Sequence, residues 1–327
     1  MGRKAAFVWL VALAFVPFHL AEAQQPGRVA KIGWLGARPA PLEGGIKLFQ
    51  REFRKLGYVE GKNIAIESRY ADNKLDRLPV LADELVRLKV DVLITPGTNE
   101  TAAAKNATKT TPIVFLGVSA DPVGVGLVDS LARPGGNITG FTIIAAELAG
   151  KRLELLKETI PKLSRVALLW NPREPGSVLQ WKEGQLPARE LGLQLHSMEV
   201  SSTEKYEAAF KEATNARSSA LAVTQGPLNI SNQRQIANLA AKNQLPAIYP
   251  RDDFVASGGL MSYGADPAES FRRGAAMVDK ILKGAKPADI PVEQPTRFEL
   301  MINLKTAKAL GLVIPSVVMM RAEKVIK

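Results

Sequence analysis

Short apolar segments alternate with amphipathic segments along nearly the whole chain. The strand-like segments fall into two series, the first at residues 29–35, 64–70, 90–95, 112–118 and 138–142, and the second at residues 165–170, 193–200, 220–224, 246–250 and 259–264. Segments with helical periodicity lie between them, such as GGIKLFQREFRKLG at 44–57 and AESFRRGAAMVDKILKG at 268–284. Strands separated by helices are typical of parallel sheets. The pattern predicts an α/β fold of two doubly wound, Rossmann-like lobes with a ligand cleft between them.

Several loops that follow the predicted strands are rich in Gly, Ser, Thr and Asn. In doubly wound sheets, ligands bind where loops leave the carboxyl ends of the strands, so lobes that face each other would place these loops around one cleft. Taken singly, each loop is better explained by ordinary turn and cap chemistry, whereas the loops together favour a ligand cleft. The ligand-binding residues expected on these and adjoining loops are Leu35, Gly36, Ala37, Gly97, Thr98, Asn99, Ser119, Asp121, Asn171, Gln225, Gly226, Asp252 and Tyr263.

The segment TPGTNETAAAK at 95–105 is the strongest of these candidates. Gly97 permits a sharp turn after an apolar strand, and Thr98 or Asn99 can cap a helix that continues through three alanines. A helix that begins at the carboxyl edge of a sheet offers backbone N–H groups to an anionic group of a ligand. The alternative is a helix that caps itself, with Glu100 as its negative charge.

The N-terminal residues have the pattern of a secretory signal peptide. Arg3 and Lys4 precede an apolar run that ends in the small-x-small triplet Ala21-Glu22-Ala23. The alternative, an uncleaved anchor, fits less well because the run is shorter than a spanning helix usually needs. We therefore expect cleavage after Ala23 and a mature protein in the periplasm or another extracytoplasmic space.

The composition excludes several kinds of chemistry. The chain has no cysteine and two histidines, of which His19 lies in the predicted signal peptide. Disulfides, thiolate nucleophiles and Cys/His zinc sites are thereby ruled out, and His196 lies in a strand-like segment rather than in a catalytic motif. The net charge of +11 comes from Lys and Arg mixed with Asp and Glu, which indicates a solvated surface and no nucleic-acid partner.

The glycine-rich segments lack the features of nucleotide sites. Gly124 and Gly126 are followed by Asp129, where a dinucleotide fingerprint needs its third glycine. The segment GYVEGKN has a glycine interval one residue too short for a phosphate loop, and Asn63 occupies the place of the magnesium-binding Ser or Thr. No carboxylate pair stands out as an acid–base pair either. We therefore expect no catalytic residue, no cofactor and no metal site.

Five segments carry a resemblance to a known family. They are DPVGVGLVDSLARPGGNITG (121–140), ELAGKRLELLKE (147–158), VALLWNP (166–172), LPAIYPRDDFVASGGLMSYG (245–264) and VDKILKGAKPADIPVEQPTRFELMINLKTAKALGLVIP (278–315). The sequence closely resembles the substrate-binding proteins of ABC transporters, in the family labelled tryptophan/tyrosine-type. The resemblance implies a type I periplasmic-binding-protein fold in a monomer that is not an enzyme. Such a protein closes on a small-molecule ligand and delivers it to an ABC permease in the cytoplasmic membrane.

The resemblance also implies a layout of the chain. After a signal peptide at 1–23, one lobe comprises 24–143 with 265–285, and the other comprises 144–264 with 286–327. The crossovers between lobes are expected at 142–146, 263–266 and 286–298. Within 121–140, the segment VGLVDSLA is expected to form a short helix and RPGGN a tight turn, so that this glycine-rich stretch is scaffold.

Two cleft loops depart from the pattern of the family. TPGTNE stands where many members have Gly-Gly-Thr-Pro, and TQGPLN stands near an expected Asp-Pro. Because these loops select the ligand, its identity stays open between an amino acid and another small carboxylate or organic solute. Two alternative functions also remain: a ligand sensor that contacts a membrane signalling protein, and an enzyme built on the same two-lobed frame.

Overall fold

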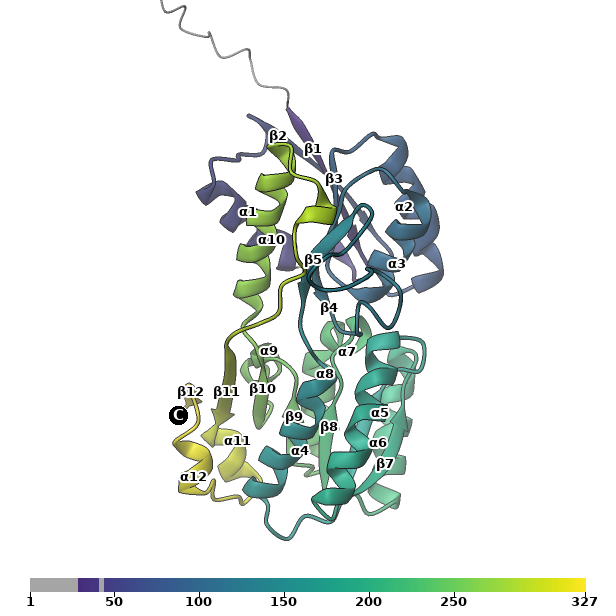
Figure 1. Ribbon diagram of the computed structural model, residues 1–327. Coiled ribbons are helices and arrows are strands. Elements are labelled where there is room, and N and C mark those ends of the chain that lie inside the picture. The colour runs from purple at the N-terminus through teal and green to yellow at the C-terminus, as the bar shows by residue number, and fades with distance from the viewer. Residues whose placement is uncertain (1–28, 41–43) are drawn as a thin grey trace, which may run out of the picture.

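The computed structural model describes residues 29–40 and 44–327, and it consists of two α/β lobes stacked end to end (Figure 1). Each lobe has its own sheet with helices on both faces, which confirms the predicted fold class. The predicted signal peptide at 1–23 lies outside the described residues.

The first lobe is built on a five-stranded parallel sheet with the order β2-β1-β3-β4-β5. Its strands are β1 (Ala30–Gly36), β2 (Ile64–Tyr70), β3 (Val92–Thr95), β4 (Ile113–Val118) and β5 (Ile138–Thr142). Successive side chains of a strand point to opposite faces of a sheet. Leu93 accordingly packs in one apolar cluster and Ile94 in another. Burial on both faces explains why these strands are continuous apolar runs.

Helices from two distant parts of the chain cover the first sheet. They are α1 (Gly44–Lys55), α2 (Leu78–Arg87), α3 (Thr98–Ala107) and α10 (Pro267–Leu282). Phe49 and Phe53 of α1 pack with Trp34 and with Val278 of α10 on one face, while α2 and α3 cover the other. Because α10 follows the strands of the second lobe, the chain must return to the first lobe to complete its core.

The second lobe is built on a seven-stranded sheet with the order β12-β11-β10-β9-β8-β6-β7. Its strands are β6 (Arg165–Trp170), β7 (Gln194–Glu199), β8 (Ala220–Val223), β9 (Ala247–Tyr249), β10 (Met261–Ala265), β11 (Phe298–Asn303) and β12 (Lys324–Ile326). The sheet is parallel, as expected, except that β11 pairs antiparallel with β10. The chain comes back from the first lobe alongside β10 in the opposite direction, so FELMIN adds a strand that the alternation of strand and helix did not predict.

The helices of the second lobe also lie on both faces of its sheet. They are α4 (Glu147–Thr159), α5 (Pro175–Glu190), α6 (Tyr206–Asn215), α7 (Pro227–Ser231), α8 (Gln233–Lys242), α9 (Asp252–Ala256), α11 (Leu304–Ala309) and α12 (Ser316–Met319). Leu168 and Leu169 of β6 point into two different apolar clusters, one on each face of the sheet.

Three segments carry the chain from one lobe to the other. They connect β5 to α4, β10 to α10, and the turn at Pro287–Asp289 to β11. Residues 286–293 still belong to the first lobe, because Val292 is part of its core and Glu293 pairs with Phe141. The chain therefore leaves the first lobe later than the boundary expected at residue 285.

The glycine-rich segment 121–140 is a run of turns that leads into β5. The short helix expected at 125–132 is absent from this described segment. Gly126 adopts a left-handed φ of 69°, which a helix does not accommodate, and the Lys105 ammonium donates to the carbonyls of Gly126 and Leu127. The expected turn at RPGGN is present, with Gly135 and Gly136 at φ values of 70° and 58°.

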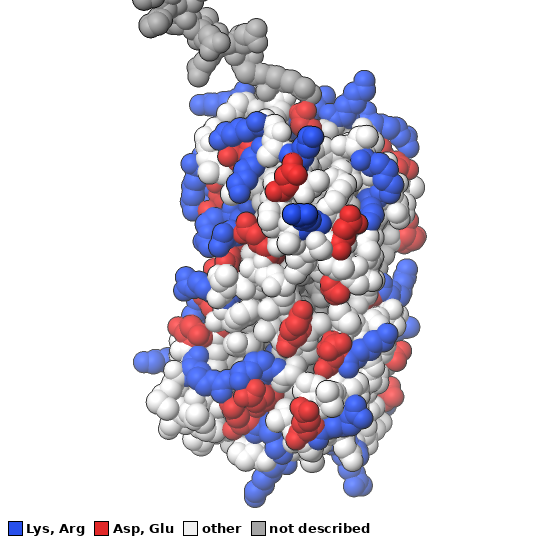
Figure 2. Space-filling view, in the orientation of Figure 1, with Lys and Arg blue, Asp and Glu red and all other residues white. Residues whose placement is uncertain are grey.

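Both signs of charge are interspersed on the molecular surface. On the face in Figure 2, Lys and Arg side chains lie among Asp and Glu over both lobes rather than in one basic patch. Across residues 29–40 and 44–327, no helix combines the length and the apolar character that crossing a membrane requires.

Close contact between β4 and β5 makes Gly140 a sensitive position. A Cβ at this residue would lie 2.2 Å from the carbonyl oxygen of Phe115, which belongs to the backbone of the neighbouring strand. We expect Gly140→Ala to lower the free energy of unfolding by about 1–3 kcal/mol in urea titrations. Gly44→Ala is the control, since a Cβ there meets nothing within 4 Å. Equal stability of the two variants would contradict this packing.

Candidate functional site

A cavity lies between the lobes, at the carboxyl ends of both sheets. Six of the thirteen expected residues line it, namely Gly97, Thr98, Asn99, Ser119, Gln225 and Gly226. Gly97 ends the loop after β3, Thr98 and Asn99 begin α3, and Ser119 lies in the loop after β4. Gln225 and Gly226 follow β8 in the other lobe. The cavity is therefore enclosed by loops from both lobes.

The lobes touch each other at the rim of this cavity. A Cβ at Gly176 of α5 would lie 2.0 Å from Ser119 Oγ of the first lobe, so only glycine allows this approach. In a second contact between the lobes, the Ser231 hydroxyl lies 3.2 Å from Asn73 Oδ1 and donates to it. The structure is thus a closed arrangement of the two lobes.

In the first lobe, the Thr98 side chain holds two cavity loops together. Its Oγ1 accepts from the backbone N–H of Ser119 at 3.2 Å and from that of Ala120 at 3.4 Å. The expectation that Thr98 or Asn99 caps α3 is wrong, because Gly97 is the N-cap residue. The Glu100 carboxyl, which the alternative named as the negative charge of the helix start, is buried in the first turn of α3 and lines the cavity. Thr98 instead fixes the wall of the cavity, and the first turn of α3 faces the cavity with the Glu100 carboxyl in it.

In the second lobe, two buried side chains of α5 join the loops after β6 and β8. Ser177 Oγ of α5 accepts from the backbone N–H of Asn171 at 2.9 Å and lies 2.6 Å from Thr224 Oγ1. The Gln180 side-chain amide makes two hydrogen bonds to the backbone of Gln225. It accepts from the Gln225 N–H at 2.8 Å and donates to the Gln225 carbonyl at 3.0 Å. These bonds set the position of the loop after β8.

Glu174 is a buried carboxyl group on the wall of the cavity, with only 3% of its surface exposed. Burial raises its pKa to about 7, although the Leu228 N–H and the Asn171 side chain act in the opposite direction. Its Oε1 accepts from Leu228 N at 3.2 Å. A Cβ at residue 226 would lie only 1.8 Å from Glu174 Oε2, so a glycine is required beside this carboxyl group.

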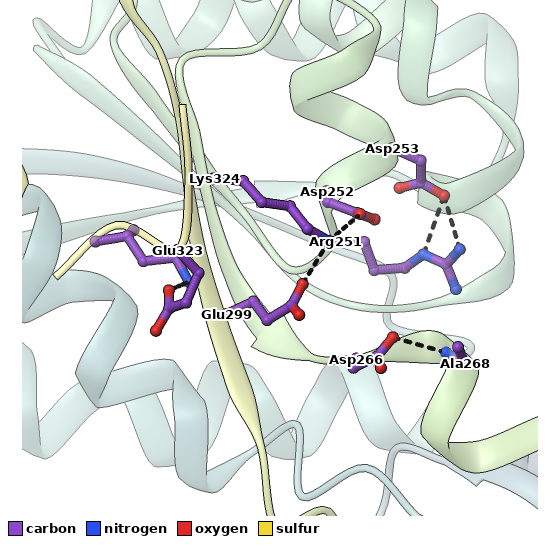
Figure 3. A network of polar contacts seen from close by, with 9 residues as sticks. Arg251, Asp252, Asp253, Asp266, Ala268, Glu299, Glu323 and Lys324 are labelled. Atoms are coloured by element: carbon purple, nitrogen blue, oxygen red, sulfur yellow. Dashed lines mark hydrogen bonds and ion pairs between the residues drawn. The ribbon is translucent and has the colours of Figure 1, made fainter. Parts of the chain in front are cut away.

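Charged residues on the other side of the cavity form the network in Figure 3. Arg251 lines the cavity and pairs with Asp253 at 2.8 Å. Asp266, which also lines it, accepts from the Ala268 N–H at 2.9 Å and so caps α10. The site therefore holds acidic and basic groups together, as a zwitterionic or polar ligand would require.

The other expected residues lie outside the cavity lining. Leu35 and Ala37 are fully buried beneath it, with Gly36 between them at the end of β1, and the Ala37 N–H donates to Glu100 Oε1 at 3.2 Å. Asp121 is exposed and accepts from the Val123 N–H within its own turn.

Asn171, Asp252 and Tyr263 have structural contacts instead. Asn171 accepts from the Arg173 N–H at 3.0 Å in the loop after β6. Asp252 lies 3.7 Å from Lys324 of β12 (Figure 3). The Tyr263 ring packs against Phe298 with a centroid distance of 6.2 Å.

Sequence reasoning missed several residues that line the cavity. Glu174 and Gly176 lie in the loop NPREPGS, from which only Asn171 was selected. Asp266 could have been found from the series Asp-Pro-x-Glu, which is the signature of a helix N-terminus. Phe271 follows one turn later on α10 and supplies an aromatic surface.

The described residues offer no sign of a metal centre, because no group of three or more His, Asp or Glu side chains among them could hold an ion. His196 lies in β7, away from the cavity lining. The cavity supplies hydrogen-bonding groups, opposite charges and an apolar surface, which is the chemistry of ligand binding.

Comparison with known proteins settles the family. The model of the ABC transporter substrate binding protein family matches residues 43–326. The chain belongs to this family. The ABC substrate-binding family is extracytoplasmic, and its members are ligand-binding transport proteins.

Relatives of this ABC substrate-binding protein have been described in three bacteria. A tyrosine-binding protein of Clostridioides difficile is 29% identical over 271 residues, covering 83% of this chain and 77% of the relative. A conserved domain protein of Vibrio cholerae has a TM-score of 0.86 at 27% identity, covering 91% of this chain and all of that one. An ABC domain of Streptococcus pneumonia in complex with L-Trp has a TM-score of 0.82 at 27% identity, covering 90% and 100%.

Burial of Glu174 predicts a pH-dependent stability. Because its pKa is raised from 4.5 to about 7, the folded protein binds this proton more tightly than the unfolded chain does. The stabilisation is fully present below about pH 4.5 and is lost as the pH rises through about 7. Glu174→Gln should remove this decline, which amounts to about 1.4 kcal/mol per pH unit at its steepest.

Urea titrations between pH 4.5 and 8 would measure the decline. Glu183→Gln is the matched control, because Glu183 lies on the exposed face of the same helix. If the difference in stability between wild type and Glu174→Gln were the same at every pH, Glu174 would not titrate in this range.

Proposed function

We propose that this protein is the extracytoplasmic receptor of an ABC importer, which closes on a small organic ligand and delivers it to a permease in the cytoplasmic membrane. The observation that carries the proposal is the cavity between the lobes, which is lined by Thr98 and Ser119 on one side and by Gly176 and Gln225 on the other. A ligand that contacts both walls stabilises the closed form over the open one. The protein acts as a monomer, without catalysis.

The ligand is an amino acid with an apolar or aromatic side chain. Arg251, which lines the cavity, suits a carboxylate, whereas the buried Glu100 carboxyl in the first turn of α3 opposes one there. Glu174 and Asp266 offer acidic groups to an ammonium. Phe271 and Ile230 provide an apolar surface for the side chain. The tyrosine and tryptophan named for two relatives fit the same three requirements.

Closure takes place about the three segments that join the lobes. One moving body comprises residues 29–40, 44–141 and 267–293, the other comprises 147–262 and 299–327, and the hinge residues lie between them. Hinges of this kind are a few residues at the ends of strands and helices that absorb changes in φ and ψ. The permease then distinguishes the closed, loaded receptor from the open one. The signal peptide at 1–23 provides the export that this role requires.

A substitution at the rim tests ligand binding by closure. Gly176→Ala places a methyl group 2.0 Å from Ser119 Oγ of the other lobe, so it should prevent full closure. In calorimetric titrations of the mature protein with L-tyrosine and L-tryptophan, we expect wild type to bind at least one of them. Gly176→Ala should bind it at least tenfold more weakly, a loss of about 1.4 kcal/mol or more.

Two further variants separate closure from folding. Gly184→Ala adds a methyl group to the same helix, but its nearest neighbours lie 3.7–3.9 Å away, so it should bind like wild type. Adding Ser119→Gly to Gly176→Ala removes the nearest obstructing atoms and should restore part of the affinity. Wild-type affinity in Gly176→Ala would contradict closure, and failure of both amino acids to bind wild type would contradict the assigned ligand class.

A further inference from the structure

Arg152 of α4 is a buried cation without a carboxylate partner. Only 3% of its surface is exposed, and no ion pair found among residues 29–40 and 44–327 includes it. Burial lowers its pKa to about 10, so the guanidinium stays charged at neutral pH. Burying a charge without an opposite charge is unfavourable unless hydrogen bonds replace its water. An apolar side chain would be buried here at a lower free-energy cost. The presence of a guanidinium therefore points to a role for its directional hydrogen bonds.

The hydrogen bonds of Arg152 reach two of the three crossovers. Its Nε donates to the carbonyl of Tyr263 at 2.9 Å, and its Nη1 lies 3.4 Å from the carbonyl of Ala145. Ala145 lies between β5 and α4, and Tyr263 lies two residues before the end of β10. The third crossover runs beside the second, because Ala265 pairs with Phe298. One guanidinium therefore joins the segments about which the lobes would move.

The first crossover contains a strained residue next to this contact. Ile144 has a φ of 42°, and it is the only β-branched residue among the non-glycine residues with positive φ in the described chain. This conformation is a genuine outlier for a β-branched side chain. It persists only when the surroundings hold it, and the neighbouring carbonyl of Ala145 is bonded to Arg152. The preceding residue, Ile143, lines the cavity.

Arg152 is also linked to the opposite part of the site through Gln180. Nη1 lies 3.4 Å from Gln180 Oε1, the atom that accepts from the Gln225 N–H. The Gln180 amide nitrogen donates to the carbonyls of Gly176 and Gln225. Both of these residues line the cavity. A continuous set of hydrogen bonds thus runs from the crossovers to the cavity wall of the second lobe.

We propose that Arg152 is a positioning residue that holds Ile144 in its strained conformation and thereby stabilises the closed, ligand-binding arrangement of the lobes. The proposal rests on the proposed function, because it assigns to Arg152 the balance between the open and closed forms of that receptor. When the lobes open, the first crossover releases Ala145 from the guanidinium, and Ile144 relaxes to negative φ. The strain at Ile144 then favours opening, and the bonds of Arg152 favour closure.

The distance between the lobes tests this balance without any ligand. The chain has no cysteine, so Lys74→Cys and Arg234→Cys introduce two unique sites for spin labels. Both residues are exposed and flank the contact between Asn73 of one lobe and Ser231 of the other. Pulsed electron paramagnetic resonance then measures the short, closed separations and the longer, open ones in each variant.

Two substitutions should shift this distribution in opposite directions. Arg152→Met should deplete the short separations. Ile144→Gly should enrich them about fivefold or more relative to the open form, because glycine adopts positive φ without strain. Lys151→Met is the matched control on the same helix, since Lys151 pairs only with Glu154 on the surface, and it should match wild type. Where L-tyrosine or L-tryptophan binds, its affinity should fall about tenfold in Arg152→Met and rise in Ile144→Gly.

The outcomes separate this proposal from the proposed function. Unchanged distances in both Arg152→Met and Ile144→Gly would overturn the role of Arg152, even if the amino acids bind. Opposite shifts would support it, even if neither amino acid binds. If Arg152→Met does not fold, Arg152→Lys replaces it, because an ammonium cannot reproduce the fork of bonds to two crossovers, and the Ile144→Gly result stands independently.

Discussion

The site depends on one constraint: two sheets present the carboxyl ends of their strands to each other across a narrow gap. At such an edge, loops expose backbone N–H groups of helix N-termini, which need polar partners. In a single lobe water supplies those partners. Between two lobes, the polar groups of both edges share a closed space, and a small polar ligand can satisfy them together. The cavity lined by Thr98 and Gln225 follows from this arrangement.

The walls of the cavity are rigid because buried hydroxyl and amide groups connect them. Thr98 joins the loops after β3 and β4, and Ser177 with Thr224 joins those after β6 and β8. Such buried networks hold a single arrangement when all members are satisfied. On the proposed function, the lobes move relative to each other at the three crossovers. The positive φ of Ile144 and the bonds of Arg152 lie at these crossovers, where we propose that they set the balance between the open and closed forms.

The sequence predicted much of the fold because burial on both faces leaves a local signal. All ten predicted strands are present, since parallel strands such as β4 (Ile113–Val118) are continuous apolar runs between turn residues. The strand β11 (Phe298–Asn303) was missed because its pairing with β10 depends on the chain returning from the other lobe. The prediction of a helix at 125–132 was wrong because Gly126 adopts a left-handed conformation, which a helix does not accommodate despite the apolar residues around it.

The site was less predictable than the fold, for a physical reason. Residues such as Gly97 and Gln225 follow strands directly, and their place at a sheet edge was readable. The roles of Glu174 and Arg152 depend on burial and on partners more than 50 residues away, Leu228 and Tyr263, which a single sequence does not reveal.

The most direct test is a crystal structure of the mature protein grown with the amino acid that binds it. The account predicts the ligand between the lobes, in contact with both the Thr98–Asn99 turn and the Gly176 and Gln225 loops. A ligand bound to one lobe alone, or outside this cavity, would contradict it.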